Sequence, residues 1–242
     1  MNEKFRKPLN VTLTVLFATA LTLFILTFAI GLPIYCRFFY YIQIKTLKME
    51  EATGWSYQTI KTAYDEVLNY LTLPGRAFGT GELAWTESEA AHFADCRVLF
   101  NLNLSVFIIS GAICLALILL NRFKIIELAR IKRHRAYLIS AVVALALPVI
   151  IGALAAIDFD RAFIVFHAIF FPGKDNWTFN PDTEQIIEVM PEEFFMNCAI
   201  IIGVGLVAFS LALIIADVVL TLRDKKRAEL EKDTVENNQV DG

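Results

Sequence analysis

Two histidines, His92 and His167, are the residues best suited to chemistry, because imidazole can take up and release protons near neutral pH. His92 shares one predicted helical face with Glu89, Asp95 and Cys96, at positions i, i+3, i+6 and i+7. His167 lies among phenylalanines, where an imidazole needs polar partners. Two histidines that each have carboxylates nearby indicate a shared site for general acid–base chemistry.

Each histidine also has a simpler interpretation. His92 could be a helix-surface residue and His167 a filler of an aromatic strand, in which case the two need not meet. A zinc site is a further alternative, since histidines and carboxylates ligate zinc, but the two histidines lack HxxxH spacing. The third histidine, His134, stands between Arg133 and Arg135 and is interpreted as an interfacial basic residue.

The composition is that of a membrane protein. Of the 242 residues, 57% are hydrophobic and 19% charged, with a mean hydropathy of +0.56. An average soluble domain is about 45–50% apolar and about 25% charged. The net charge of -3 provides no basic field, so a nucleic-acid partner is not expected.

Four apolar runs are long enough to cross a hydrocarbon core, which takes about 20 helical residues. They cover roughly residues 11–34, 99–120, 137–157 and 196–222. Their interiors lack formal charges except for Asp217, which lies near the end of the fourth run and is expected at the headgroups. The first run is too long for the apolar region of a signal peptide and is interpreted as a retained anchor.

Basic residues determine the orientation of these spans. The N-terminus, the connection between the second and third runs, and the tail 223–242 carry 14 of the 22 lysines and arginines. With four spans, these three segments lie on the same side of the membrane, and the positive-inside rule predicts that this side is the cytoplasm. Residues 35–98 and 158–195, here called the first and second connecting segments, then face outward. They hold 16 acidic and 8 basic residues, and they place both candidate histidines near the outer headgroups.

The first connecting segment is predicted to be mostly helical. Ser56 is a plausible N-cap, apolar residues at helical spacing follow over 60–71, and Pro74 ends the run. Thr86 or Ser88 is expected to cap the helix that continues into the second span. Cys36 and Cys96, both outward, could form a disulfide, although sequence alone does not place their Cα atoms.

The second connecting segment shows a different pattern. Residues 163–171 are rich in β-branched and aromatic types and predict a strand, and residues 177–189 predict a hairpin. Pro191 fits the first turn of the last helix. The expected fold is therefore a single integral membrane domain of four transmembrane helices, with a small extracytoplasmic α+β cap built from the two connecting segments.

Three sequence blocks resemble a bacterial integral membrane family that includes the lipoprotein intramolecular transacylase Lit. The first block comprises residues 41–42, 51–56 and 69–71, with Ile60 and Tyr64. The second, residues 89–97, is similar to the family pattern ExxHxxDVK, with Cys96 in place of the usual valine. The third comprises residues 166–171, 176–181 and 191–195, and the run Lys174-Asp175-Asn176 departs from the usual order before the tryptophan. The resemblance covers about residues 10–222.

The resemblance implies a membrane acyltransferase at the outer surface of the bacterial cell membrane. The sn-2 acyl chain of a diacylglyceryl-cysteine lipoprotein would move to the α-amine of that same N-terminal cysteine, giving a lyso-form lipoprotein. Conversion of an ester to an amide is downhill, so neither a cofactor nor a metal is expected. The implied partners are diacylated lipoproteins as substrate and membrane lipids, and the oligomeric state is left open.

The resemblance also implies roles for particular residues. His92 and His167 would be the catalytic pair, one as base toward the α-amine, whose pKa is about 7.7–8.0, and the other as acid or oxyanion donor. Which histidine has which role stays open. Asp95 could hold the tautomer of His92 or be a surface carboxylate, while Asn176 and Trp177 are expected to support the hairpin or position the headgroup. The alternatives are a non-catalytic membrane scaffold and a lipid-directed or zinc hydrolase.

Overall fold

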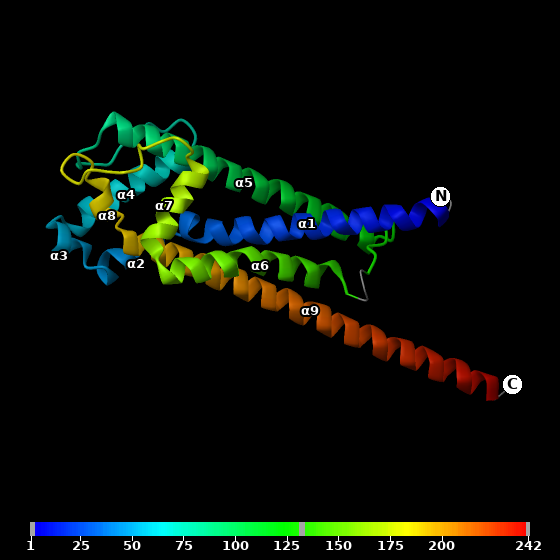
Figure 1. Cartoon of the computed structure of the whole chain (residues 1–242). Helices are drawn as coiled ribbons and strands as arrows, with labels where there is room; N and C mark the ends of the chain where they lie inside the picture. Colours follow the sequence, from blue (N-terminus) through cyan, green and yellow to red (C-terminus); the bar gives the residue numbers. More distant parts are fainter. Residues whose placement is uncertain (1–2, 131–133, 241–242) are drawn as a thin grey trace. The chain divides into compact units, whose positions relative to one another are not determined.

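The computed structural model describes residues 3–130 and 134–240, which form nine helices and no strand (Figure 1). The long helices are α1 (Glu3–Tyr35), α5 (Glu87–Arg122), α6 (Ala136–Ile157) and α9 (Glu192–Val240). The short helices are α2 (Arg37–Thr46), α3 (Met49–Thr53), α4 (Tyr57–Thr72), α7 (Phe159–Phe170) and α8 (Ile186–Val189). Lys132 and Arg133 of the predicted cytoplasmic connection lie outside the described residues.

The four long helices contain the four predicted apolar runs. Within the described parts of the chain, four helices are long and apolar enough to cross a membrane, as the sequence predicted. At 36 residues, α5 is about 54 Å long, well beyond a hydrocarbon core of about 30 Å. The charged residues Glu87, Glu89, Asp95 and Arg97 all lie in its first three turns. The uncharged stretch that can cross the core therefore begins after Arg97, and His92 precedes it.

The predicted strand and hairpin of the second connecting segment are wrong. Residues 163–171 lie mostly in α7, because the Asp158 carboxylate caps this helix by accepting a hydrogen bond from the Arg161 amide. Phenylalanines at 159, 163, 166 and 170 follow a helical spacing that the strand prediction overlooked. Aromatic and β-branched residues favour strands only when a neighbouring strand is present to pack against. The α+β cap is thus a helical one across all described residues.

Two compact units make up the chain. One comprises Met1–Ile25, Ser110–Ala146 and Leu206–Gly242, and the other, here called the site unit, comprises Leu26–Ile109 and Leu147–Gly205. In the first unit Asp217 is only 2% exposed. It accepts a hydrogen bond from the Arg135 amide, and its other oxygen lies 3.1 Å from Nδ1 of His134.

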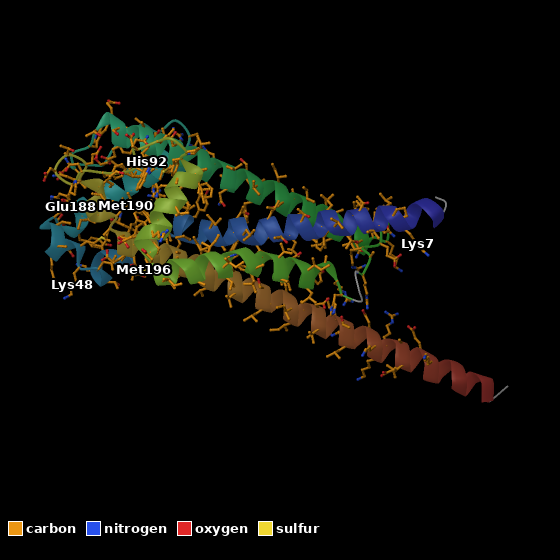
Figure 2. All side chains as sticks on the ribbon, viewed as in Figure 1. Lys7, Lys48, His92, Glu188, Met190 and Met196 are labelled. Carbon is orange, nitrogen blue, oxygen red and sulfur yellow. The ribbon has the colours of Figure 1, made fainter. Side chains whose placement is uncertain are left out.

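The core of the site unit forms where the short helices meet. The six apolar residues predicted to face inward from α4 are all buried: Ile60, Ala63, Tyr64, Val67, Leu68 and Leu71. The Tyr40 ring stacks on that of Tyr64 at 3.5 Å between centroids, and its hydroxyl donates to the carbonyl of Val189. This bond ties α2 to the end of α8, next to the buried Met190 that Figure 2 labels among the short helices.

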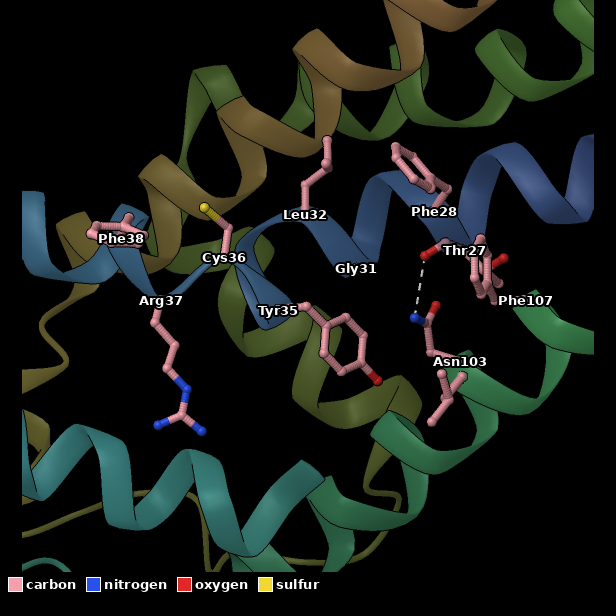
Figure 3. Close-up of a pocket in the computed structure, with 11 residues that line it drawn as sticks. Thr27, Phe28, Gly31, Leu32, Tyr35, Cys36, Arg37, Phe38, Asn103 and Phe107 are labelled. Carbon is pink, nitrogen blue, oxygen red and sulfur yellow. Dashed lines mark hydrogen bonds between the residues drawn. The ribbon is translucent and has the colours of Figure 1, made fainter. Parts of the chain in front are cut away.

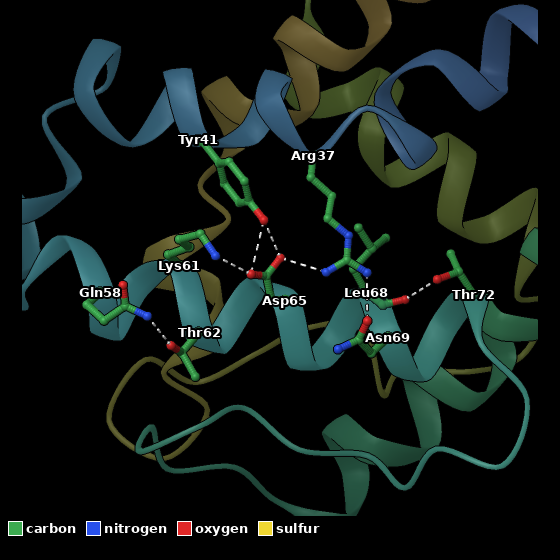
Figure 4. A network of polar contacts seen from close by, with 9 residues as sticks. All are labelled: Arg37, Tyr41, Gln58, Lys61, Thr62, Asp65, Leu68, Asn69 and Thr72. Atoms are coloured by element: carbon green, nitrogen blue, oxygen red, sulfur yellow. Dashed lines mark hydrogen bonds and ion pairs between the residues drawn. The ribbon is translucent and has the colours of Figure 1, made fainter.

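A polar network also joins α2 to α4 (Figure 4). The Asp65 carboxylate accepts from the Arg37 guanidinium at 2.8 Å, the Lys61 ammonium at 2.7 Å and the Tyr41 hydroxyl at 2.8 Å. Arg37 also donates to the Asn69 side chain at 2.6 Å. The predicted Ser56 cap begins α4 by accepting from the Thr59 amide.

Candidate active site

The fold brings His92 and His167 together. Their ring centroids lie 5.8 Å apart, although one side chain comes from the start of α5 and the other from α7. Both are only 6% exposed. Aromatic rings surround the pair, including Phe171 at 5.0 Å and Phe179 at 5.5 Å from the His92 centroid. The two candidate residues therefore share one water-poor site.

Local structure at the start of α5 orients His92. The Thr86 hydroxyl accepts from the Glu89 amide, which confirms Thr86 as a cap and sets the direction of the first turn. Nε2 of His92 lies 3.4 Å from Sγ of Cys96, one turn further along. Nδ1 of His92 is buried and has no hydrogen-bond partner among the described residues. One ring nitrogen is thus occupied and the other is left for a ligand.

In His167 the bonded ring nitrogen is Nδ1, not Nε2 as in His92. Its Nδ1 lies 2.8 Å from the carbonyl oxygen of Phe163, and because a carbonyl only accepts, this nitrogen carries the hydrogen. Burial lowers the pKa of His167, and the bond to Phe163 only partly opposes this. The ring is therefore neutral near pH 7, with a lone pair on Nε2. Trp177 stacks against it at 4.4 Å and donates its Nε1 hydrogen to the Lys174 carbonyl.

The three supporting residues lie beside the pair. The Asp95 carboxylate binds the Lys174 ammonium and, at 3.4 Å, the side-chain nitrogen of Asn176, rather than His92. The side-chain oxygen of Asn176 is buried without a partner in the described part of the chain. Asp95 therefore connects α5 to the loop that carries Asn176 and Trp177.

No three histidine, cysteine, aspartate or glutamate residues gather in a metal-binding arrangement within residues 3–130 and 134–240. The four cysteines are free in the structure, so Cys36 and Cys96 form no disulfide there. Cys36 is exposed, whereas the Cys96 sulfur contacts His92. That contact was foreseeable from the spacing of four residues, which places both side chains on one helical face.

A cavity of about 700 Å³ lies between the end of α1, the start of α2 and α5 (Figure 3). Its lining is predominantly apolar and includes Phe28, Leu32, Leu104 and Phe107. The Asn103 side chain donates to the Thr27 carbonyl across it. Asn103 follows His92 by three helical turns, so both side chains leave α5 in nearly the same direction, about 16 Å apart along the axis.

A family model described as lipoprotein intramolecular transacylase Lit matches residues 15–195. The match covers most of the chain, including the whole region in which the two histidines meet. The chain belongs to the Lit family. This confirms the family resemblance of the three sequence blocks. No curated protein sequence matches this Lit family member significantly.

Solved structures of Lit from Bacillus cereus, a membrane-integral lipoprotein intramolecular transacylase, share the fold. One superposes with a TM-score of 0.81 at 22% identity, covering 91% of this chain and 99% of the other. Two variants of the Bacillus protein, with one histidine replaced by arginine or by alanine, give TM-scores of 0.76 and 0.77 at 21% and 22% identity. Both matches cover 93% of this chain, together with 97% of the arginine variant and 100% of the alanine variant.

Proposed function

We propose that this Lit family member is a lipoprotein intramolecular transacylase. It moves the sn-2 acyl chain of a diacylglyceryl-cysteine lipoprotein to the α-amine of the same cysteine. The observation that carries the proposal is the pair of buried histidines, whose ring centroids lie 5.8 Å apart. His92 uses Nε2 for its contact with Cys96, whereas His167 uses Nδ1 for its bond to Phe163. Family membership supports the reaction class, and the hydrogen bonds of the two rings support the roles that we assign to them.

His167 acts as the base. With Nδ1–H held by the Phe163 carbonyl, Nε2 is the nitrogen that accepts a proton. The α-amine attacks the ester carbonyl carbon, an N–C bond forms, and the proton lost from nitrogen goes to Nε2 of His167. Stacking on Trp177 holds the ring in this orientation.

His92 acts as the donor. We assign the Cys96 thiol as hydrogen-bond donor to Nε2, which places the His92 hydrogen on Nδ1, the nitrogen that has no partner among the described residues. Nδ1–H stabilises the oxyanion of the tetrahedral intermediate. The His167 imidazolium then passes its proton to the sn-2 oxygen as the C–O bond breaks, which leaves a monoacylglyceryl thioether with a free hydroxyl and returns both histidines to their neutral forms.

The apolar cavity receives the migrating acyl chain. A chain whose ester carbonyl lies at His92 and whose tail follows α5 reaches the level of Asn103 and the ring of Phe107. Because the tail already lies in hydrocarbon before binding, the cavity contributes orientation more than affinity. The walls thus hold the carbonyl still while the amine approaches.

The same proposal covers the setting of the reaction. The termini are cytoplasmic and the site lies at the outer membrane surface, on the basis of the distribution of lysine and arginine. Ester-to-amide exchange within one molecule requires no external energy source, so we propose a reaction without a cofactor.

Histidine variants test the proposal. His92→Gln and His167→Gln are each expected to abolish lyso-form product while the protein stays at normal membrane levels. His134→Gln is the matched control, because its ring contacts Asp217 in the other unit and takes no part in the reaction. Product formation by a His92→Gln/His167→Gln double variant would contradict the mechanism and favour a non-catalytic role for the pair.

A further inference from the structure

One face of α7 is apolar and exposed. Five large side chains form it, each between 47% and 66% exposed: Ile164, Val165, Phe166, Ile169 and Phe170. His167 leaves the other side of the same helix and is only 6% exposed. A narrow side of α7 therefore packs on the protein, while the wider side, here called the exposed face of α7, is left largely uncovered by the described residues.

Aromatic contacts hold the narrow side in place. The Phe163 ring lies 5.5 Å, between centroids, from that of Phe195 in the first turn of α9. Trp177 stacks on His167 at 4.4 Å, so the loop after α7 packs on the same side. Because α7 is docked through this side, its exposed face has a fixed direction relative to the rest of the site unit.

The charges of α7 are confined to one end. They lie in the N-terminal cap and the first turn: Asp158, Asp160 and Arg161. Between Arg161 and Lys174 the sequence has no aspartate, glutamate, lysine or arginine. Exposed apolar patches mark contacts with a membrane or with another protein. Interfaces between proteins carry about one hydrogen bond per 100–200 Å², and a face without polar side chains offers none, which favours lipid.

The direction of α7 also favours lipid. At 12 residues the helix is about 18 Å long, too short to cross a hydrocarbon core of about 30 Å. It runs across the direction of the parts of α5 and α6 that belong to the site unit (Figure 1). Since α5 and α6 cross the membrane, a helix that runs across them lies close to the membrane plane.

The exposed face is continuous in sequence with the lipid-facing surface of α6. Near the end of α6, Val149, Ile150 and Ile151 are 53–59% exposed, and Ile157 is 83% exposed. Only Asp158 separates α6 from α7. Apolar side chains without a protein cover thus extend from a membrane span directly into α7.

We propose that α7 is an in-plane membrane helix whose exposed face is inserted among the acyl chains of the lipid leaflet beside the site unit. The inference does not depend on the proposed transacylase function, because it rests on exposure, charge and direction alone. It adds that His167 is carried by a helix whose far side is in lipid, about 10–12 Å away across the helix. Lipid ester groups lie where the acyl chains begin, so the imidazole is held near the depth of such an ester.

The test uses purified full-length protein in which Cys36→Ala removes the exposed native thiol. One cysteine is then added, by Val165→Cys or Ile169→Cys, and is labelled with a bimane maleimide before reconstitution into phosphatidylcholine vesicles. These side chains are 49% and 66% exposed, so both variants are expected to melt at the temperature of the parent protein. The Cys36→Ala protein taken through the same labelling gives the background signal.

Lipids brominated along their acyl chains are expected to quench both labels, whereas aqueous iodide is not. Comparison of bromine positions gives the depth of each label, expected at about 5–10 Å into the boundary between headgroups and acyl chains. An in-plane helix places the two labels at equal depth, while a helix aligned with the spans would separate them by about 6 Å. Asp182→Cys, at an exposed loop residue, is the matched control and is expected to be quenched by iodide only.

Three results would overturn the inference. Quenching of the labels at 165 and 169 by iodide alone would place the exposed face in water. Quenching by neither agent would show that protein covers it, as in contact with a second copy of the chain. A depth difference of about 6 Å between the two labels would show that α7 is aligned with the spans.

Discussion

Replacing Asp65 by asparagine is expected to weaken the contact between α2 and α4 and so to lower the free energy of unfolding. Asp65 binds Arg37 and Lys61 at 2.8 and 2.7 Å, with 32% and 29% of those side chains exposed and 19% of its own. Charge-assisted hydrogen bonds contribute about 1.5–3 kcal/mol each when buried, and partial exposure reduces this to about 1 kcal/mol each. We therefore expect a loss of about 2 kcal/mol, which for a chain of this size lowers the melting temperature by about 4–8 °C.

The effect is expected to depend on pH in a definite direction. Burial opposes ionisation of Asp65, but the donors Lys61, Tyr41 and Arg37 outweigh it and lower its pKa. A lowered folded-state pKa stabilises the protein above the unfolded value of about 3.9. That stability is lost as pH falls through the folded-state value. The difference between wild type and Asp65→Asn is thus largest at pH 7 and shrinks below about pH 4.

Thermal unfolding in detergent at pH 7 and at pH 3.5 measures both quantities. Asp182→Asn is the control, since Asp182 is exposed and takes part in no ion pair found in the described residues. Equal melting temperatures for Asp65→Asn and wild type at pH 7, or a difference that persists unchanged in acid, would refute the reasoning.

Two further predictions concern the cavity and the orientation. Leu104→Trp fills the cavity, so conversion of substrates with long sn-2 chains is expected to fall several-fold more than conversion of substrates with short ones. Leu102 does not line the cavity, and Leu102→Trp is expected to leave this chain-length preference unchanged. Acyl-chain profiles of the product measure this, and equal losses at all lengths would contradict the assigned role. The exposed Cys36 is expected to react with a membrane-impermeant maleimide on intact cells, and the buried Cys114 is not. Labelling only after cell lysis, with Cys36→Ala as control, would reverse the assigned orientation.

The parts of the fold that follow from local pattern could be predicted from sequence. The four apolar runs, the buried face of α4 and the Ser56 cap each depend on spacing within one segment. The strand predicted from the aromatic and β-branched composition of residues 163–171 is a helix, as the spacing of Phe159, Phe163, Phe166 and Phe170 indicates. Composition is the weaker signal there, because a capped helix satisfies its backbone hydrogen-bonding groups without a neighbouring strand.

The candidate site could be predicted only in part. Sequence named His92 and His167, but their distance depends on how the second connecting segment folds back, which no local pattern specifies. Helical spacing places Cys96 on the same face as His92, but the sequence analysis did not predict that its sulfur contacts the ring. The complete burial of Glu89 depends on tertiary packing, which no local pattern specifies.

The central claim is an acyl transfer within one lipoprotein, and the position of the acyl group in the product tests it most directly. The chain would be expressed in a bacterium whose lipoproteins are diacylated, and the N-terminal lipopeptide of an abundant lipoprotein would be fragmented by mass spectrometry. Intramolecular transfer leaves the total mass unchanged, so fragment ions must locate the chain. An acyl group on the α-amine together with a monoacylglyceryl thioether is the predicted result. An unchanged diacylglyceryl-cysteine with a free amine, in cells that hold the protein in their membrane, would contradict the account.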